Sequence, residues 1–281
     1  MANFTAADIK ALREKTGAGM LDVKNALTES DGDTAKAEEI LRLKGLKVAA
    51  KREDRTASNG LVLSHISDSD EGQTGVILEV NAETDFVAKN EKFIAFAEKI
   101  LAAAVAAKAT TVAEVLAAPS EDGTVEDSVK NMIGIIGEKL GVGRIETLSG
   151  EHVEAYMHRT ATDLPPQVAV LVATDAAGAG VAHDVAVHIA AMSPKYLTQD
   201  AVPADVVDNE RRIATELTIA EGKPEKAVPA IVQGRLQGFF KQVVLLDQPY
   251  ARDPKVSVGK VLQEAGATVT GYARVRVGQQ D

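Results

Sequence analysis

Cysteine is absent from this sequence of 281 residues. Its absence excludes disulfides, iron–sulfur clusters, thiolate zinc sites and a cysteine nucleophile. An excess of basic charge is also missing, because 31 lysines and arginines stand against 41 aspartates and glutamates. The formal net charge of −10 argues against sequence-independent binding to nucleic acid or to acidic membranes.

Long apolar runs are missing too. No run approaches the ~20 residues that span a bilayer. The first ten residues, MANFTAADIK, have neither the basic start nor the apolar core of a signal peptide. We therefore expect a cytoplasmic protein without a membrane contact. What is present is 45% hydrophobic residues, enough for a sizeable core, and a length that favours two domains at roughly 150 residues each.

The beginning of the chain predicts three short helices, separated by the turn sequences TGAG and SDGD. Thr5 is a suitable N-cap, with Asp8 three residues on, as in a capping box. In the second helix, Met20, Val23 and Leu27 recur at the three- and four-residue spacings of one helix face. These helices are few and short, so they would form a small bundle.

A charged connector is expected next. The third helix is predicted to end at Gly45, and residues 47–60 have no apolar period. We interpret them as a solvated linker. Contact of their basic side chains with an anionic partner is the alternative that the sequence leaves open. Residues 1–55 are thus expected to form a helical module with its linker.

After the linker, the pattern changes to that of strands. The sequences LVLSHI and GVILEV, on either side of a polar turn, predict a β-hairpin. A long helix is expected next, with Phe86 and Phe93 on its apolar stripe. Two further helices begin at Thr111 and Thr124, each with an acid three residues on. These elements would make up the first core unit, residues 56–150.

A similar unit is predicted for residues 151–281. The strand-like sequences HVEAYMH and QVAVLVAT precede a helix through Val185, so two strands followed by a helix occur twice. Residues 203–240 interrupt this unit. A stripe through Leu217 and Ala220, the turn EGKP and a return segment predict a helical hairpin too thin to bury both of its faces. The overall prediction is an α+β fold with a duplicated core.

Motifs for nucleotide chemistry are incomplete. Neither Gly-Lys pair fits the phosphate-binding GxxxxGK[ST] loop, because Pro224 and Val261 stand where a hydroxyl is required. The sequence AAGAGVAHD has a glycine-rich start, but His183 occupies the place of the third glycine of a dinucleotide loop. We favour a flexible turn here. A small dehydrogenase built on this turn is the alternative from another functional class.

The five histidines do not have the spacing of a metal site. His152 and His158 are about 20 Å apart if they lie on one strand, and His183 and His188 are five residues apart on a predicted helix. No GxSxG sequence and no cluster of Ser, His and Asp stands out. We expect no metal, no cofactor and no catalytic residues.

One stretch, EVNAETDFVAKN, places a strand end, an acidic turn and an aromatic residue together. In the simpler interpretation, which the residues alone favour, Thr84 or Asp85 caps the following helix and Phe86 enters the core. In the alternative, Asp85 and Phe86 lie on an exposed tip and press into a partner. An aromatic anchor beside a charge is a common interface hot spot.

Two motifs resemble signatures of the bacterial translation elongation factor Ts family. They are LREKTGAGMLDVKNAL at residues 12–27 and EVNAETDFVAK at residues 79–89. The resemblance continues through SPKYL, EGKPEKAVPAIVQGRLQGFF and VTGYARVRVG, so it covers essentially the whole chain. It implies a ubiquitin-associated-like helical module, a duplicated α+β core and a coiled-coil hairpin inserted in the second repeat.

The resemblance also implies a function. Members of the family are guanine-nucleotide exchange factors for elongation factor Tu, the GTPase that delivers aminoacyl-tRNA to the ribosome. Thr84, Asp85, Phe86 and Val87 match the family tetrapeptide TDFV, which acts in displacing Mg²⁺ from the GTPase. Phe86 would wedge between partner helices near the nucleotide, with Asp85 beside it. The factor would remain on the nucleotide-free GTPase until GTP enters.

Three further positions are implied as partner contacts. His158 resembles a family histidine that meets the same partner surface, and Arg13 and Met20 match positions that pack on a partner helix. Leu21 stands where some members have methionine. Such a factor forms no covalent bond, so it is not an enzyme, and it needs no nucleic acid contact.

Some points stay open at this stage. The hairpin could form a homodimer or contact the partner. Some members continue into a C-terminal helix, whereas this sequence stops four residues after Val277, and exchange is expected without that helix. An adaptor whose core is only a scaffold is a further alternative. It predicts that deletion of residues 1–55 abolishes activity and that a change at Phe86 does not.

Overall fold

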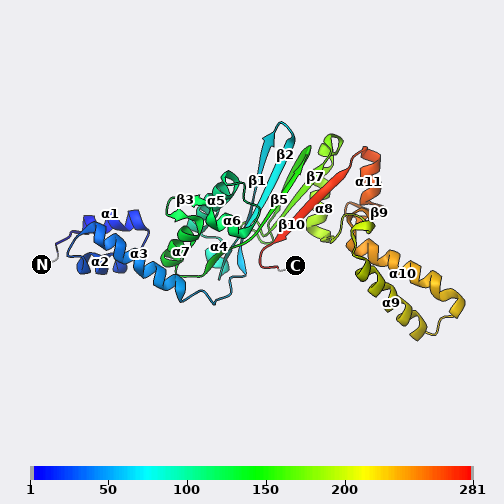
Figure 1. The fold of residues 1–281 in the computed structure, drawn as a ribbon, viewed down its shortest axis with the longest axis horizontal. Coiled ribbons are helices and arrows are strands. Elements are labelled where there is room, and N and C mark those ends of the chain that lie inside the picture. Colours follow the sequence, from blue (N-terminus) through cyan, green and yellow to red (C-terminus); the bar gives the residue numbers. More distant parts are fainter. Residues whose placement is uncertain (1–2, 280–281) are drawn as a thin grey trace.

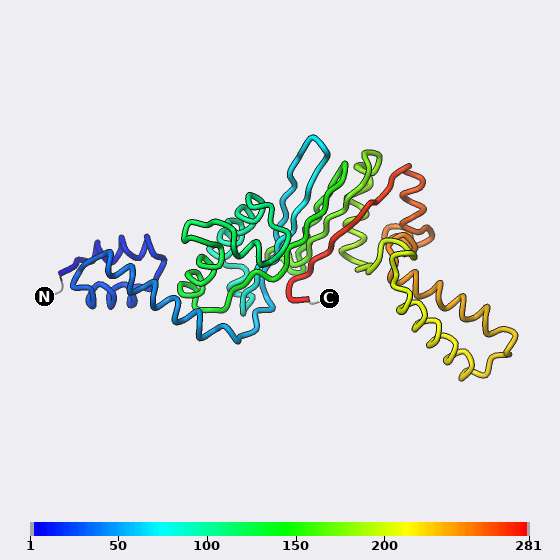
Figure 2. Tube along the Cα trace, in the orientation of Figure 1, coloured from blue at the N-terminus to red at the C-terminus, as the bar shows by residue number. Residues whose placement is uncertain are grey.

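The computed structural model describes residues 3–279 as an elongated molecule (Figure 1). A helical module lies at one end, a core of sheets and helices lies in the middle, and a long helical hairpin projects at the other end (Figure 2). No helix in residues 3–279 is long and apolar enough to cross a bilayer.

Three helices form the N-terminal module: α1 (Ala6–Thr16), α2 (Met20–Glu29) and α3 (Thr34–Ala50). The predicted capping box is present, since the Thr5 hydroxyl accepts from Asp8 N–H and the Asp8 carboxylate accepts from Thr5 N–H. Gly17 ends α1 with φ at 68°, in the left-handed region that favours glycine. The module has a small core of its own, made by Leu12, Val23, Ala26, Leu27 and Ala37.

The third helix does not end at Gly45, and this part of the prediction is wrong. Helix α3 continues to Ala50, so the first residues of the expected linker are helical. The reason lies in a distant helix, α7 (Val125–Ile136). A Cβ atom added at Gly134 of α7 would lie 2.5 Å from Gly45 Cα. The two glycines therefore let α3 and α7 cross in close contact, and Ala49 is buried in the core beyond the crossing.

The core contains two three-stranded antiparallel sheets. The first consists of β1 (Asn59–Ser69), β2 (Gly72–Ala82) and β5 (Leu140–Gly150), in the order β1-β2-β5. The second consists of β6 (His152–His158), β7 (Val168–Thr174) and β10 (Val269–Arg276), in the order β10-β7-β6. Each sheet thus has a hairpin whose second strand pairs with a strand that follows later in the chain. The same topology occurs twice, as the repeated pattern predicted.

Strand β5 was not predicted. Its sequence contains Gly141 and Gly143, which weaken the strand pattern. The helix predicted from Thr124 ends at Ile136, with Gly137 as its left-handed cap, and β5 begins four residues later. Asn81 and Glu79 of β2 lie where a Gly143 side chain would stand, so the neighbouring strand requires this glycine.

Four layers make up the core. The two sheets pack face to face, with Val62 and Ile77 of the first against Leu171 and Val275 of the second. A Cβ at Gly75 would lie 2.8 Å from both Leu171 and Val153 side-chain atoms, so the sheets approach closely there. The outer face of each sheet is covered by helices (Figure 1).

The covering helices differ in number. Those on the first sheet are α5 (Glu91–Ala106), α6 (Val112–Ala117) and α7. The predicted N-caps at Thr111 and Thr124 are both present as complete capping boxes, and the two-residue strands β3 (Pro119–Ser120) and β4 (Gly123–Thr124) connect α6 to α7. Those on the second sheet are α8 (Ala182–Met192) and α11 (Val258–Ala265), with the strands β8 (Pro249–Tyr250) and β9 (Asp253–Ser257) beside them.

The glycine-rich sequence 176–180 forms a short 3₁₀ turn, η1 (Ala176–Gly180), between β7 and α8. Both neighbours of β7 run antiparallel to it. A dinucleotide loop requires a parallel strand–helix–strand unit. The alternative of a dehydrogenase built on this turn is therefore wrong, and the interpretation as a turn is confirmed.

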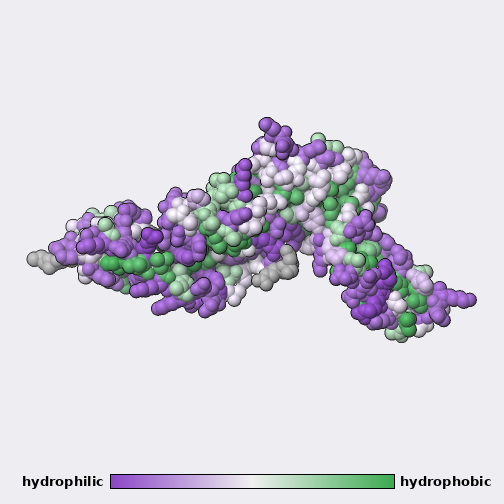
Figure 3. Space-filling model, viewed as in Figure 1, coloured by the Kyte–Doolittle hydropathy of each residue, from purple (hydrophilic) through white to green (hydrophobic). Residues whose placement is uncertain are grey.

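The helical hairpin consists of α9 (Ala204–Ala220) and α10 (Val228–Val243). The predicted stripe is wrong at Leu217 and Ala220, because both of these side chains are exposed. Ala214 and Thr218 of α9 face the buried Val232, Leu236 and Phe240 of α10 instead. The buried Thr218 hydroxyl donates to Ala214 O at 2.6 Å, which satisfies it within the helix. Apolar patches remain on the mostly hydrophilic surface of the hairpin (Figure 3).

Candidate functional site

The most exposed aromatic side chain lies on a short turn between β2 and α5. The expected single long helix is two helices, α4 (Asp85–Ala88) and α5, and a second cap at Asn90 separates them. Phe86 is 73% exposed. The interpretation that Phe86 enters the core is therefore wrong, and the exposed tip is confirmed, although Thr84 does cap the helix as predicted.

Burial of the other side of α4 explains this exposure. Val87 and Ala88 are both buried, and Val87 packs in the cluster of the first sheet and its helices. Successive residues of a helix point about 100° apart, so Asp85 and Phe86 face solvent when the next two residues face the core. The four-residue tip, Thr84 to Val87, thus presents an acid and an aromatic ring side by side.

Lys89 restrains the tip from one side. Its Nζ lies 5.1 Å from the centroid of the Phe86 ring, a distance typical of a cation–π contact. The same Nζ lies 3.1 Å from the Asp163 carboxylate, in the loop between β6 and β7. That ion pair connects the tip to the second core unit and lowers the pKa of Asp163.

Two acidic residues hold the base of the tip. Glu138 accepts hydrogen bonds from Thr84 N–H at 3.1 Å and from the Thr84 hydroxyl at 2.9 Å. Glu83 accepts from Lys139 N–H at 2.6 Å, and its carboxylate pairs with Arg52 at 3.2 Å and Arg55 at 2.9 Å. The Lys139 N–H makes the largest contribution to lowering the pKa of Glu83. None of these partners was predicted, because they are distant in sequence.

His158 lies exposed at the end of β6. Its Nδ1 is 3.1 Å from the Tyr156 hydroxyl, and the loop that begins after it contains Asp163. The ion pair between Asp163 and Lys89 therefore brings the segment after His158 to the tip. His158 itself is exposed five residues before Asp163, and it contacts Tyr156.

Arg13 and Met20 lie elsewhere, on α1 and α2 at the end of the molecule (Figure 1). Both side chains are exposed, and Met20 and its neighbour Leu21 are 61% and 68% exposed. The prediction that Met20 shares the buried stripe of Val23 and Leu27 is therefore wrong. The exposed pair forms a second apolar surface, separate from the tip.

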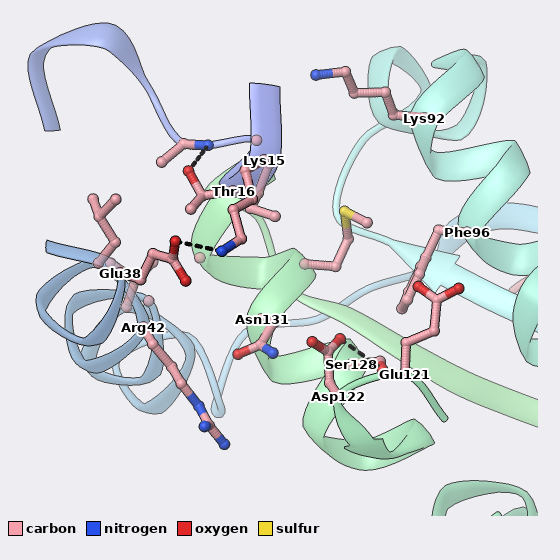
Figure 4. Close-up of a pocket in the computed structure, with 18 of the residues that line it drawn as sticks. Lys15, Thr16, Glu38, Arg42, Lys92, Phe96, Glu121, Asp122, Ser128 and Asn131 are labelled. Carbon is pink, nitrogen blue, oxygen red and sulfur yellow. Dashed lines mark hydrogen bonds and ion pairs between the residues drawn. The ribbon is translucent and has the colours of Figure 1, made fainter. Parts of the chain in front are cut away.

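A cleft of about 900 Å³ lies between the module and the core (Figure 4). Thr16, Glu38 and Arg42 line it from the module, and Phe96 and Asn131 line it from the core. Several of its polar groups pair within one side, for example Lys15 with Glu38 at 2.6 Å in the module and Ser128 with Asp122 at 2.9 Å in the core. This arrangement is that of a seam between two packed parts. In residues 3–279, no group of three or more His, Asp or Glu side chains is placed to hold a metal ion.

Comparison with known proteins gives a consistent result. Residues 83–279 match the family model described as "Elongation factor TS". The protein "Elongation factor Ts" of Beutenbergia cavernae is 58% identical over 280 residues, which cover 99% of this chain and 100% of that protein. Those of Micrococcus luteus and Kocuria rhizophila are 57% and 55% identical, again over 99% of this chain and 100% of each relative. This chain therefore belongs to the elongation factor Ts family.

Proposed function

We propose that this protein promotes the release of GDP from elongation factor Tu and inserts Phe86 between helices of that GTPase near its nucleotide. The observation that supports this most directly is an aromatic side chain, 73% exposed, on a turn whose base is held by hydrogen bonds. An aromatic side chain that a partner can bury is a common source of binding energy at protein interfaces. Asp85 stands beside the ring and would accompany it.

Displacement of the partner's Mg²⁺ is the proposed route to release. Mg²⁺ requires near-octahedral oxygen ligands and offsets the repulsion among the phosphate charges. A wedge that moves one of these ligands, or the loop around the phosphates, leaves the nucleotide poorly neutralised. GDP then dissociates, and the factor remains on the nucleotide-free GTPase. Because coupling between two ligands is reciprocal, GTP that enters weakens the binding of the factor by the same amount.

Other surfaces would make the complex stable. Arg13 and Met20 would pack on a helix of the partner, and His158 would meet the surface that the tip also contacts. Their exposure supports this assignment. We infer that the module of residues 1–55 is ubiquitin-associated-like and that 56–150 and 151–281 are two core subdomains. The hairpin at 203–240 would be a coiled coil, which either contacts the partner or forms a homodimer.

The proposed action is binding without covalent chemistry, in the cytoplasm, and it requires no cofactor. Nucleotide chemistry stays with the partner, and the factor only changes the relative stability of its nucleotide-bound and nucleotide-free states. In the proposed action, Asp85 and Phe86 only contact the partner, and no bond to either side chain is formed or broken. We therefore assign no catalytic residue.

Substitution of Phe86 tests the proposal. Release of a fluorescent GDP from elongation factor Tu is measured with the wild-type protein, Phe86→Ala and Met192→Ala, whose side chain is 45% exposed on α8. We expect the wild type to accelerate release, Phe86→Ala to lose about tenfold or more, which corresponds to about 1.4 kcal/mol, and Met192→Ala to act like the wild type.

Two outcomes would contradict the proposal in different ways. If the wild-type protein does not accelerate release, the exchange function is wrong. If Phe86→Ala accelerates as the wild type does and Met20→Asp abolishes the effect, the adaptor alternative is favoured and the wedge is wrong. The second result would move the mechanism from the tip to the helical module.

A further inference from the structure

We propose that Glu83 and Glu138, here called the carboxylate clamp, are positioning residues that hold the tip so that Phe86 is presented to the partner. Glu138 bonds to Thr84, the N-cap of α4, whereas Glu83 is the residue before that cap and bonds to Lys139 N–H. Neither glutamate belongs to the tip itself. This inference rests on the proposed function. It adds to it the groups that fix the wedge in place.

Glu138 completes the cap of α4. The Thr84 hydroxyl has one proton, which it donates to the Glu138 carboxylate at 2.9 Å. Its lone pairs then face Val87 N–H, from which the hydroxyl accepts at 3.4 Å. A charged acceptor strengthens such a chain of hydrogen bonds. The orientation of the cap therefore depends on a carboxylate that is distant in sequence.

Glu83, the residue before Thr84, binds the same segment, but here the carboxylate belongs to the strand end and the backbone N–H to residue 139. Its carboxylate accepts from Lys139 N–H, so residues 83 and 84 both bind residues 138 and 139. The Glu83 side chain is only 16% exposed, and the Asn59 side chain donates to its backbone carbonyl at 2.8 Å. The strand end before the tip is thereby held from several directions.

The clamp also reaches the helical module. Arg52 and Arg55 follow directly after α3, and both pair with Glu83. The segment that leaves the module is thus fixed to the residue next to Thr84. The two exposed surfaces, Met20 with Leu21 and Phe86 with Asp85, are connected through one carboxylate as well as through the crossing of α3 and α7.

The tip needs such support. A helix as short as α4, Asp85–Ala88, is not stable by itself, because nucleation of the first turn is unfavourable. Phe86 is exposed, so burial of its own ring cannot fix its direction. A loop that is ordered before binding loses less conformational entropy in the complex. The clamp supplies this order without covering the ring.

Variants at Glu138 test the clamp against a matched control. Glu114 makes bonds of the same kind at α6, where it accepts from Thr110 N–H at 2.7 Å and Thr111 N–H at 3.1 Å. Glu114→Ala therefore removes a similar carboxylate from the N-terminus of another helix, where its bonds are to Thr110 and Thr111 and not to the tip. We expect Glu138→Ala to reduce the maximal rate of fluorescent GDP release by about tenfold, the size of a lost charged hydrogen bond. Glu138→Gln should reduce the maximal rate of GDP release less than Glu138→Ala does, and Glu114→Ala should not reduce it.

A double variant shows whether Glu138 acts through the wedge. If the clamp only positions Phe86, then Glu138→Ala should cause no further loss in a Phe86→Ala background, since the two changes remove one unit. An equal loss in both backgrounds would overturn the proposal. So would full activity of Glu138→Ala alongside an impaired Phe86→Ala, a result that leaves the proposed function intact.

Hydrogen exchange tests the clamp without the partner. The Val87 amide, which donates to the Thr84 hydroxyl, should exchange about tenfold faster in Glu138→Ala and at the wild-type rate in Glu114→Ala. An unchanged Val87 amide in Glu138→Ala would overturn the clamp, whatever the exchange activity of the protein. Failure of the wild type to release GDP would instead overturn the proposed function.

Discussion

Two helical glycines show how one added methyl group can have opposite effects. A Cβ at Gly134 of α7 would lie 2.5 Å from Gly45 Cα, so α3 and α7 would have to separate. Gly134→Ala is expected to lower the free energy of unfolding by about 1–3 kcal/mol. At Gly238 of α10, no atom other than those of the adjacent residues and the helix's own backbone lies within 4 Å of the added Cβ. Gly238→Ala should raise the free energy of unfolding by about 0.4–1 kcal/mol, because alanine restricts the unfolded chain and favours helix.

Urea unfolding of the two variants beside the wild type measures both changes. Opposite signs would confirm that the position of the methyl group, and not the residue type, decides the effect. A stabilised Gly134→Ala would contradict the close crossing of α3 and α7. The same variant also disturbs the packing of the helical module on the core, because α3 belongs to that module.

Residue-scale features were predictable where the bonds are local. The capping boxes at Thr5, Thr111 and Thr124 each join residues three apart, and all three are present. The residues alone favoured burial of Phe86, because it stands at helical spacing from Phe93, and the exposed tip was only the alternative. Asn90 was the available signal, since it is a good N-cap and begins a new helix between the two aromatics. The bonds of Thr84 to Glu138 had no local signal.

At the scale of elements, one buried histidine joins the hairpin to the core. His188 of α8 accepts from Ala251 N–H through Nδ1 at 3.1 Å, so its Nε2 donates to Gln248 Oε1 at 2.9 Å. The Gln248 amide then donates to Gln242 O at the end of α10, at 2.9 Å. Burial lowers the pKa of His188 below its ordinary value of 6.5. The network therefore requires the neutral ring.

Acid should weaken this junction. Because the pKa of His188 is lower in the folded protein, the unfolded chain binds the proton first as the pH falls below 6.5. The free energy of unfolding should then decrease by up to about 1.4 kcal/mol per pH unit. Carboxylates with a lowered pKa, such as Glu83 and Glu114, lose their contribution only below 4.5. Between pH 6.5 and pH 5, the change in the free energy of unfolding therefore reports on His188 and not on these carboxylates.

His188→Gln is the variant that checks this effect. The variant should be less stable than the wild type at pH 7.5, and the difference should shrink as the pH falls to 5. Unfolding in urea at several pH values gives both curves. A difference that stays constant over this range would show that protonation of His188 does not control the stability of the hairpin base.

Elements were predicted better than the faces they bury. Both helices of the hairpin followed from apolar periodicity and the EGKP turn. Periodicity placed Leu217 inside, whereas the helices meet at the smaller Ala214 and Thr218. Small side chains allow a closer approach of the two backbones, and a scale of hydrophobicity alone does not contain that preference. Strand β5 and the extension of α3 were missed for a related reason, since both depend on partners elsewhere in the chain.

The whole molecule is an array of separate hydrophobic clusters, and its parts should therefore differ in local stability. The cluster of the N-terminal module contains five buried residues, among them Leu12 and Leu27. It is separate from the core cluster, which α3 joins near Ala49. We expect amides of α1 and α2 to exchange faster than those of β2 and β7, because opening the module exposes little apolar surface.

Hydrogen exchange followed by mass spectrometry measures these differences in amide exchange rate. The variant Gly134→Ala tests whether they depend on the contact of the module with the core. If the crossing with Gly45 seats the module, the variant should speed exchange in α1, α2 and α3 and leave α9 and α10 unchanged, since the hairpin has its own cluster at the far end. Equal acceleration throughout the chain would mean that the molecule unfolds as one unit. A selective effect would mean that the glycine crossing holds the module against the core, so that the exposed Met20 and Leu21 keep a fixed position relative to the tip.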